Sequence, residues 1–315
     1  MRLIAGDIGG TKTLLRLVDE SGACLLEGRY DSGAYETFDD LLREFIPRVD
    51  GPVDAACFAI AGLVRDRRGS VTNIGWELGE EALARDFALG RVSLINDFSA
   101  IALGVPLLRE HDVLSLQRGK RDPEAPIGIL GAGTGLGQAI VTRYGGTYQV
   151  IATEGGHGDF APQDEEQARL FLHLHRIYGH VSWERVVSGM GLVNIFTFLG
   201  GEELTPAEIA EPAERGDSRA GHAFDVFVDT YGAEAGNMAL SVLARGGVYL
   251  AGGIAAKNVE RFTDGRFVEA FVRKGRFREL METIPVDLIV NEEVGVIGAA
   301  EGARRSLESR QGGGG

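Results

Sequence analysis

The hydrophobic pattern of the chain opens with three short apolar runs in quick succession, at 3–5, 14–18 and 24–30. Each run is short and bounded by turn residues, so the pattern predicts three strands joined by tight turns. The first turn is the glycine-rich stretch Gly6-Asp-Ile-Gly-Gly-Thr-Lys12, and the second is Glu20-Ser-Gly22. The chain is therefore expected to begin with a strand–turn–strand–turn–strand unit.

The same succession occurs a second time near the middle of the chain. Apolar runs at 127–130, 138–142 and 148–153 are separated by a glycine-rich turn, Gly131-Ala-Gly-Thr-Gly-Leu-Gly137, and by Tyr144-Gly-Gly146. Backbone N–H groups of such a turn can converge on an anion, because residues without Cβ adopt positive φ and approach a ligand closely. The duplication predicts one phosphate-binding hairpin used twice, although either turn alone is also compatible with an ordinary tight hairpin.

Neither turn matches the commoner nucleotide-binding motifs. A P-loop has lysine directly after its second glycine, whereas Thr11 precedes Lys12 here. A dinucleotide-binding turn that starts at Gly131 has glycine at the position that Leu136 occupies. P-loop and Rossmann folds are therefore excluded. The hydroxyl groups of Thr11 and Thr134 favour phosphate binding over a plain hairpin.

Strand and helix patterns alternate after the first hairpin unit. Apolar residues at helical spacing predict helices over 38–46, 77–87 and 98–103. Continuous apolar runs at 55–61 and 92–95 predict buried strands. Alternation of this kind is typical of an α/β domain.

The second hairpin unit is likewise followed by helices and strands. Helices are predicted over 163–178, 205–215, 218–243 and 297–307, and strands over 247–251 and 285–290. Thr205, Pro206 and Glu208 have the types expected at the N-cap, N1 and N3 positions of a helix. Gly232 and Gly236 share one face of the long helix, where they permit a close neighbour.

A charged and proline-containing stretch at 109–126 predicts a domain boundary. We expect a small α/β domain over 1–106, a large α/β domain over 107–294, and a C-terminal helix at about 295–311 that packs back on the small domain. Residues 312–315 are four glycines and are expected to form a flexible tail. Two similar lobes, each opened by an antiparallel hairpin, predict a cleft between them.

Composition narrows the class of protein. The formal net charge of −14 argues against non-specific nucleic-acid binding and against a polybasic membrane contact. Asp7 follows too few apolar residues for a signal peptide, and no apolar run reaches the ~18 residues of a membrane helix. Cys24 and Cys57, the two cysteines, lie in apolar runs and are expected to be buried reduced thiols. A cytoplasmic protein is expected, with no nucleic-acid or membrane partner.

Asp97 is the best candidate for a general base. It follows the strand predicted at 92–95, and α/β sheets bind ligands at the carboxyl ends of parallel strands. Asn96 beside it both donates and accepts hydrogen bonds. The alternative is that Asp97 caps the following helix. Asp7 lies within the first glycine turn, where a carboxylate repels phosphates unless Mg²⁺ stands between them, so its position predicts a metal–nucleotide complex.

A third group of candidates lies after the second hairpin unit. Glycines flank Glu154 and His157, which lets both side chains turn toward one pocket, and a carboxylate with an imidazole suits recognition of neighbouring hydroxyls. A zinc or acid/base role, or a purely structural role, is the alternative for His157. Glu184 is also compatible with an N3 capping glutamate near Ser182.

Seven motifs follow one another along the chain: Gly6-Asp-Ile-Gly-Gly-Thr11, Thr72-Asn-Ile-Gly-Trp76, Ile95-Asn-Asp-Phe98, Gly131-Ala-Gly-Thr-Gly-Leu-Gly137, Glu154-Gly-Gly-His157 with Asp159-Phe-Ala-Pro162, Glu184-Arg-Val-Val-Ser-Gly189, and Ala251-Gly-Gly-Ile254. In these motifs the chain resembles bacterial ATP-dependent glucokinases, over nearly its full length. The resemblance implies the two-lobed, ribonuclease H-like (actin-like ATPase) α/β fold of the hexokinase, actin and Hsp70 group.

The resemblance also implies a role for each matching residue. Asp97 is implied as the base that takes the proton of the sugar 6-hydroxyl, and Asp7 as the residue that orients Mg²⁺ through water. The implied sugar-binding residues are Asn96, Asp97, Glu154, His157 and Glu184. Implied contacts to ATP come from Asp7, Gly9, Gly10, Thr11, Gly133 and Thr134 near the phosphates, and from Gly252 and Gly253 near the adenosine.

The chain departs from enterobacterial members at Lys12, Thr153 and Met190, where they have Asn, Gly and Pro, and these differences bear on nucleotide preference. It lacks the Cys-x-Cys-Gly-x-x-Gly-Cys zinc motif, which favours the zinc-free glucokinase family. The implied activity is phosphorylation of glucose by Mg·ATP, a step of glycolysis, in a homodimer formed through the large domain. The alternatives are a kinase for another hexose and an actin-like ATPase switch. A sugar-sensing regulator is disfavoured, because no DNA-binding segment fits before Leu3.

Overall fold

A computed structural model describes residues 1–308 and divides into two compact units. The first unit comprises residues 1–108 and the segment from Asn291 to the last described residue, and the second unit is Arg109–Val290. The predicted glycine tail lies outside the described residues. Within residues 1–308, none of the helices combines the length and apolar character needed to cross a membrane.

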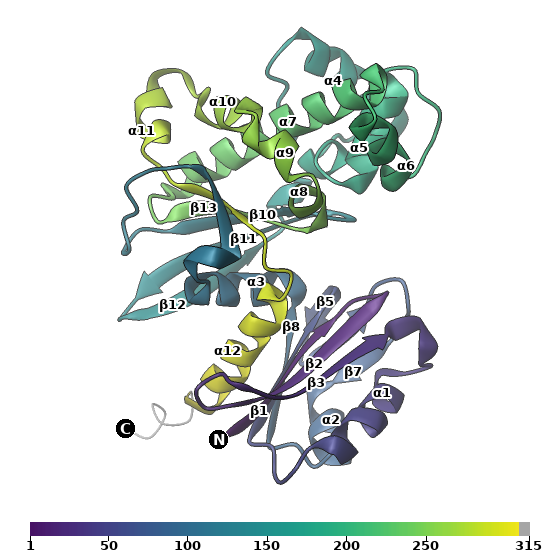
Figure 1. Cartoon of the computed structure of the whole chain (residues 1–315), viewed down its shortest axis with the longest axis vertical. Helices are drawn as coiled ribbons and strands as arrows, with labels where there is room; N and C mark the ends of the chain where they lie inside the picture. Colours follow the sequence, from purple (N-terminus) through teal and green to yellow (C-terminus); the bar gives the residue numbers. More distant parts are fainter. Residues whose placement is uncertain (309–315) are drawn as a thin grey trace. The chain divides into compact units, whose positions relative to one another are not determined.

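The first unit is built on a five-stranded sheet with the strand order β3-β2-β1-β4-β8 (Figure 1). Its strands are β1 (Arg2–Ile8), β2 (Lys12–Asp19), β3 (Cys24–Asp31), β4 (Ala55–Ile60) and β8 (Arg91–Asn96). The first three strands are antiparallel, whereas β1, β4 and β8 run parallel to one another. The carboxyl ends of β1, β4 and β8 therefore lie at the same edge of the sheet.

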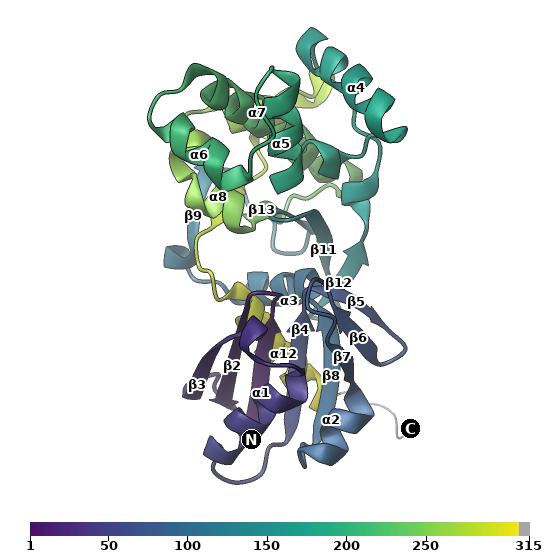
Figure 2. The same ribbon diagram turned by 90° about the vertical axis from the view of Figure 1, so that its right-hand side faces the viewer.

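Side chains of β1 alternate between the two faces of this sheet, and both faces are buried. Ile4 and Ile8 pack with α1 (Phe38–Phe45), whereas Leu3 and Ala5 pack with α12 (Val294–Glu308) and with Ala100 of α3 (Asp97–Gly104). Figure 2 shows α1 on the near side of the sheet and α12 behind it. Because Asp7 shares its parity with Leu3 and Ala5, it belongs to the face that α3 and α12 cover.

The prediction for 77–87 is partly wrong. Residues Glu77–Gly79 form strand β7, and only Glu80–Asp86 form helix α2. β7 pairs with β6 (Arg68–Val71), which pairs with β5 (Gly62–Arg65), so these strands form a small second sheet. The hairpin that joins β5 to β6 turns at two residues with positive φ, a signal that the apolar pattern does not reveal.

The sheet of the second unit has the order β12-β11-β10-β13-β14-β9. Its strands are β9 (Val113–Gln117), β10 (Ile127–Ala132), β11 (Leu136–Tyr144), β12 (Thr147–Thr153), β13 (Gly247–Ala251) and β14 (Val286–Ile289). Without β9, the order and strand directions repeat those of the first unit, so the predicted duplication of the hairpin unit is confirmed. Strand β9, which pairs antiparallel with β14 at the edge of the sheet, was not predicted from the apolar pattern.

Helix α7 is the centre of the second unit's core. The helices of this unit are α4 (Glu165–Tyr178), α5 (Gly189–Phe198), α6 (Pro206–Glu214), α7 (Ser218–Val242), α8 (Gly253–Lys257), α9 (Val259–Thr263), α10 (Arg266–Val272) and α11 (Arg278–Glu282). Gly232 and Gly236 of α7 lie against the carbonyls of Phe267 and Phe271 in α10, so the prediction of a close neighbour is confirmed. The capping box at Thr205 and Glu208 is also confirmed.

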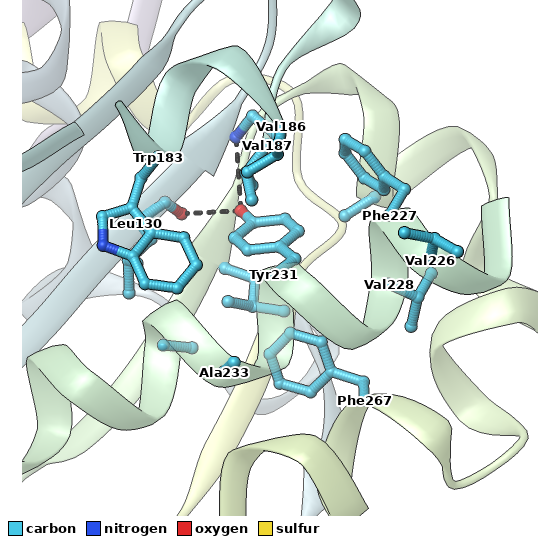
Figure 3. Packing of buried hydrophobic residues seen from close by; sticks show 14 of the residues in the cluster. Leu130, Trp183, Val186, Val187, Val226, Phe227, Val228, Tyr231, Ala233 and Phe267 are labelled. Atoms are coloured by element: carbon cyan, nitrogen blue, oxygen red, sulfur yellow. Dashed lines mark hydrogen bonds between the residues drawn. The ribbon is translucent and has the colours of Figure 1, made fainter. Parts of the chain in front are cut away.

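Tyr231 ties α7 to the strand that leads into the second glycine turn. Its ring is fully buried and packs edge-to-face against Phe227 and Phe267 (Figure 3). Its hydroxyl accepts the N–H of Ala132 at 3.2 Å and donates to the carbonyl of Leu130 at 3.3 Å. The end of β10 is thereby held from within the core.

The two cysteines differ in burial. Cys57, in the central strand β4, is fully buried as predicted, and burial raises the pKa of its thiol to about 12. Cys24 is exposed, so the prediction that both are buried is wrong. It is the first residue of β3, an edge strand whose pairing with β2 shifts register at this point, so less of the chain covers it.

Candidate functional site

The first glycine turn is a three-residue connection, Gly9-Gly10-Thr11, between β1 and β2. Gly9 N–H donates to the Lys12 carbonyl at 2.9 Å and closes the turn. Ser32 braces it from the end of β3: its N–H donates to the Thr11 carbonyl at 3.0 Å and its hydroxyl to the Gly9 carbonyl at 2.7 Å. Thr11 is exposed. The turn is fixed from behind, while its outer side is open to a ligand.

Asp7 is the next-to-last residue of β1, and only Ile8 separates it from this turn. Burial raises its pKa to about 6, with a smaller contribution from the negative charge of Asp97. Helix α12 approaches it so closely that a Cβ on Gly295 would lie 2.6 Å from Asp7 Oδ2. Glycine at position 295 therefore makes the space that the Asp7 carboxylate occupies.

Asn96 and Asp97 lie where β8 ends and α3 begins. Asn96 is the N-cap: its Oδ1 accepts the N–H of Phe98 at 2.9 Å, and its Nδ2 donates to the Gly62 carbonyl at 3.1 Å. Asp97 is the first helical residue, and its Oδ1 also accepts the Phe98 N–H at 2.9 Å. The N-cap position thus belongs to Asn96 and not to Asp97, which was the alternative role for that aspartate.

The carboxylates of Asp7 and Asp97 interact electrostatically. Burial raises the pKa of Asp97, while hydrogen bonds from the Phe98 and Asp97 N–H groups and from Asn96 oppose the rise. The Asp97 charge in turn raises the pKa of Asp7. Within residues 1–308 neither carboxylate forms a salt bridge with Lys, Arg or His. A bound divalent cation would relieve both the burial cost and the mutual repulsion, so this donor set fits Mg²⁺.

The second glycine turn, Gly133-Thr134-Gly135, connects β10 to β11 and also has three residues. Gly133 N–H donates to the Gly135 carbonyl at 2.9 Å, and Gly189 N–H donates to the Gly133 carbonyl at 2.8 Å. The carboxylate of Glu184 accepts the N–H of Leu136 at 3.0 Å. Thr134 is exposed. This turn too is fixed from one side and open on the other.

Glu154, His157 and Glu184 come together beside the second turn. His157 Nε2 lies 3.8 Å from Glu154 Oε2, and His157 Nδ1 lies 3.9 Å from Glu184 Oε1. The loop that carries Glu154 and His157 is pinned to the Glu184 segment by a hydrogen bond of 3.0 Å from Trp183 N–H to the Gly158 carbonyl. The His157 side chain is 60% exposed and that of Glu154 is 88% exposed, so both are available to a ligand.

These contacts bear on the alternatives for two residues. The Glu184 carboxylate does not cap its own helical turn, because Ser182 makes no capping hydrogen bond and the carboxylate reaches Leu136 instead. His157 is exposed and faces two carboxylates, an arrangement unlike that of a buried structural histidine.

Gly252 and Gly253 follow β13, which is the parallel neighbour of β10. Gly252 has φ +89°, and a Cβ there would lie 2.5 Å from the Ala132 carbonyl, so both conformation and space require glycine. Gly253 is exposed and begins α8. The pair lies at the same edge of the sheet as the second glycine turn, where its backbone is open to a ligand.

Several supporting residues have no signal in the sequence. Ser32 holds the first turn, Gly295 makes room for Asp7, and Tyr231 holds the end of β10. None of these three residues belongs to one of the seven motifs. Gly189 lies within one of the seven motifs, but only the structure shows that it holds Gly133.

The family model for glucokinase matches residues 4–306 of the chain. A glucokinase of Nostoc sp. is 42% identical over 339 aligned residues, which cover 96% of this chain and 99% of the relative. This chain belongs to the glucokinase family. The resemblance that the seven motifs carry is thereby confirmed.

Solved structures of glucokinases have the same fold. The glucokinase of an Antarctic psychrotroph superposes with a TM-score of 0.88 at 28% identity, covering 96% of this chain and 99% of that one. A ROK-family glucokinase of Streptomyces griseus, crystallised with glucose and AMPPNP, superposes with a TM-score of 0.64 at 21% identity, covering 97% and 100% of the two chains. The predicted actin-like α/β fold is confirmed, as is the assignment to hexose kinases.

Proposed function

We propose that this protein transfers the γ-phosphoryl group of Mg·ATP to the 6-hydroxyl of glucose, giving glucose 6-phosphate and ADP. The observation that carries the proposal is Asp97, a partly buried carboxylate without a salt bridge within residues 1–308, beside Asp7 and at the same sheet edge as the first glycine turn. Glucose and an ATP analogue are bound by the Streptomyces griseus member of the same fold, which supports these two substrates.

Asp97 acts as the general base in this proposal. Its carboxylate accepts the proton of the 6-hydroxyl as the oxygen attacks phosphorus, and a positioned base of this kind contributes roughly 10² to 10⁴ in rate. Burial raises the pKa of Asp97, which makes its carboxylate a stronger base than an exposed aspartate. The hydrogen bond from Phe98 N–H fixes the Oδ1 atom of this carboxylate.

The remaining sugar contacts belong to four polar side chains. Asn96, Glu154, His157 and Glu184 donate to or accept from the other hydroxyls, and their spacing sets the preference among hexoses. The exposed positions of Glu154 and His157 support this assignment, because neither side chain is committed to the fold.

The two glycine turns bind the phosphates in this proposal. Gly9, Gly10 and Thr11 in one turn, and Gly133 and Thr134 in the other, offer N–H and hydroxyl donors on their open sides. Gly252 and Gly253 approach the adenosine. When bound, Mg²⁺ neutralises charge on the phosphates, and Asp7 is the residue that would hold it, through water. The boundaries near residues 107 and 294, a homodimer formed by the large domain, and a cytoplasmic role in glycolysis belong to the same proposal.

A coupled assay of ADP release tests the function. Purified protein is given ATP with a panel of sugars that includes glucose, mannose, fructose and N-acetylglucosamine. With GTP or polyphosphate as the donor, formation of glucose 6-phosphate is followed in place of ADP. We expect ADP release with ATP that depends on glucose. Equal release with and without any hexose would overturn the kinase proposal in favour of an ATPase, and a faster rate with another sugar would reassign the substrate.

A further inference from the structure

The segment Glu184–Gly189 holds the second glycine turn at both of its ends. Gly189 N–H donates to the Gly133 carbonyl at 2.8 Å, where the turn begins. Glu184 Oε2 accepts the Leu136 N–H at 3.0 Å, where the turn ends, across 48 residues of sequence. Leu136 is buried, so the Glu184 carboxylate satisfies a donor that has little access to water.

The other oxygen of the same carboxylate faces the sugar-binding candidates. Glu184 Oε1 lies 3.9 Å from His157 Nδ1, and His157 in turn lies 3.8 Å from Glu154. The Glu184 side chain is 23% exposed, against 88% for Glu154, so Glu184 is the carboxylate that is built into the protein framework. One side chain therefore contacts both the phosphate-binding candidate and the hydroxyl-binding candidates.

The Glu184 carboxylate packs closely against Gly135 of the turn. A Cβ on Gly135 would lie 2.5 Å from Glu184 Oε2. Gly135 does not have positive φ, so glycine is needed here for space and not for backbone conformation. A methyl group at this position would displace the carboxylate without straining the backbone.

We propose that Glu184 is a positioning residue for the nucleotide-binding turn as well as a sugar ligand, and that it couples sugar binding to nucleotide binding inside the second unit. The inference rests on the proposed function for the identity of the two ligands. A hydroxyl bound to Oε1 fixes the orientation of the carboxylate, which fixes the Leu136 N–H and the end of the turn. Because coupling between two ligands is reciprocal, a nucleotide on the turn favours the sugar to the same degree.

The first test is the affinity for AMPPNP in the absence of sugar. Glu184→Ala leaves the Leu136 N–H without its charged acceptor and is expected to raise the Kd roughly tenfold or more. Glu184→Gln keeps an oxygen for this N–H and is expected to stay within about twofold of wild type, while its glucose KM rises. Glu154→Gln is the matched control, since within residues 1–308 no hydrogen bond joins that 88% exposed carboxylate to the turn, and its AMPPNP Kd in the absence of sugar should not change. An unchanged Kd in Glu184→Ala would overturn the proposal.

The second test is a double-mutant cycle with Gly135→Ala, followed by glucose KM and AMPPNP Kd. In the wild-type background the methyl group displaces Glu184, so the glucose KM and the AMPPNP Kd should both rise. The rise in glucose KM would be indirect, because residue 135 contributes no side chain to the sugar site. In the Glu184→Ala background the clash is absent, and the same change should have little effect. Additive effects would contradict the coupling. If Glu184→Ala does not fold, an unchanged glucose KM in Gly135→Ala overturns the proposal by itself.

Failure of the proposed function is separable from failure of this inference. AMPPNP binding is measured directly, and wild-type glucose phosphorylation is measured in the same preparation. Wild-type protein that phosphorylates glucose while Glu184→Ala binds AMPPNP normally rejects the coupling alone. Wild-type protein that binds AMPPNP but phosphorylates no sugar rejects the proposed function and the sugar half of this inference.

Discussion

The two glycine turns have the same length and place in their sheets but different chemistry. Each has three residues, and each joins the first strand of a β-hairpin to its antiparallel neighbour. The next-to-last residue of the strand before the turn is Asp7 in the first unit and Gly131 in the second. The first unit adds Asp97 at the carboxyl end of β8, whereas the corresponding strand β14 ends at Ile289.

The comparison shows how a repeated framework acquires separate tasks. In the first unit, carboxylates are placed at the strand ends despite a burial cost, which is visible in the raised pKa values of Asp7 and Asp97. In the second unit the comparable strand positions are apolar or glycine, and the charged side chains come from the segments around Glu154 and Glu184. The first unit is therefore suited to charge and proton transfer, and the second to binding.

The largest difference between the units should appear when Asp97 is neutralised. Asp97→Asn keeps a hydrogen-bonding side chain but loses basicity, so kcat should fall by a factor on the order of 10² or more while glucose Kd stays close to wild type. Steady-state kinetics with a parallel binding titration checks both values. The matched change in the second unit, Glu154→Gln, should instead weaken glucose binding. Near wild-type turnover in Asp97→Asn would leave that residue a structural role only.

Two glycines of the second unit should respond differently to alanine. Gly252→Ala places a methyl group against the Ala132 carbonyl at positive φ, so the free energy of unfolding should fall by about 2 to 3 kcal/mol. A Cβ on Gly133 would have no atom within 4 Å, and Gly133 does not have positive φ, so Gly133→Ala should leave the free energy of unfolding nearly unchanged. Urea denaturation compares them. Equal losses would mean that backbone crowding does not distinguish the two positions.

Asp7 should make the first unit less stable at neutral pH than at acid pH. Its pKa is about 6 in the folded protein, against about 3.9 in an unfolded chain, so between about pH 4 and 6 the unfolded state loses its proton first. The free energy of unfolding therefore falls as pH rises through this window and levels off above it. Asp7→Asn carries no charge, so at pH 7.5 and without ligands it should be more stable than wild type by about 2 to 3 kcal/mol.

Urea denaturation of wild type and Asp7→Asn at pH 4.5 and pH 7.5 measures this difference. The advantage of the variant should shrink at the lower pH. Asp66→Asn, at an exposed hairpin, is the control and should show no such trend. A stabilisation that is absent at pH 7.5, or equal at both pH values, would contradict the assignment of a buried charge at Asp7.

The smallest effect is expected from the brace behind the first turn. Ser32→Ala removes the hydroxyl that donates to the Gly9 carbonyl and contacts the Thr13 hydroxyl at 2.9 Å. The free energy of unfolding should fall by about 1 to 2 kcal/mol, and the KM for ATP should rise. Thermal unfolding and steady-state kinetics check the two effects. A stability loss without any change in KM would show that the brace does not position the turn.

The hairpins were predictable because local rules govern them. Short apolar runs between glycine-rich turns specify three strands within about 30 residues of sequence. The capping box at Thr205 specifies the start of a helix within four residues. Strand β9 was not predictable, because its five residues are at most half-buried and pair with β14, far along the chain. The exposed position of Cys24 depends on which strand is the sheet edge, a property of the whole fold.

The candidate site also combines residues that local sequence predicts with contacts that only the fold creates. Asp97 and Glu154 were identified from their positions after strands and beside glycines, together with the family motifs. The space that Gly295 leaves for Asp7 involves residues nearly 300 positions apart, and no pattern in either segment predicts it. The hydrogen bond from Leu136 to Glu184 likewise depends on tertiary packing.

The most direct test of the proposed phosphoryl transfer is ³¹P NMR of the reaction of wild-type protein with Mg·ATP and glucose. The account predicts that the γ-phosphorus signal of ATP is replaced by that of glucose 6-phosphate, and that Asp97→Asn abolishes most of this conversion. Inorganic phosphate as the main product, with no sugar phosphate, would contradict the assignment of Asp97 as a base for a sugar hydroxyl.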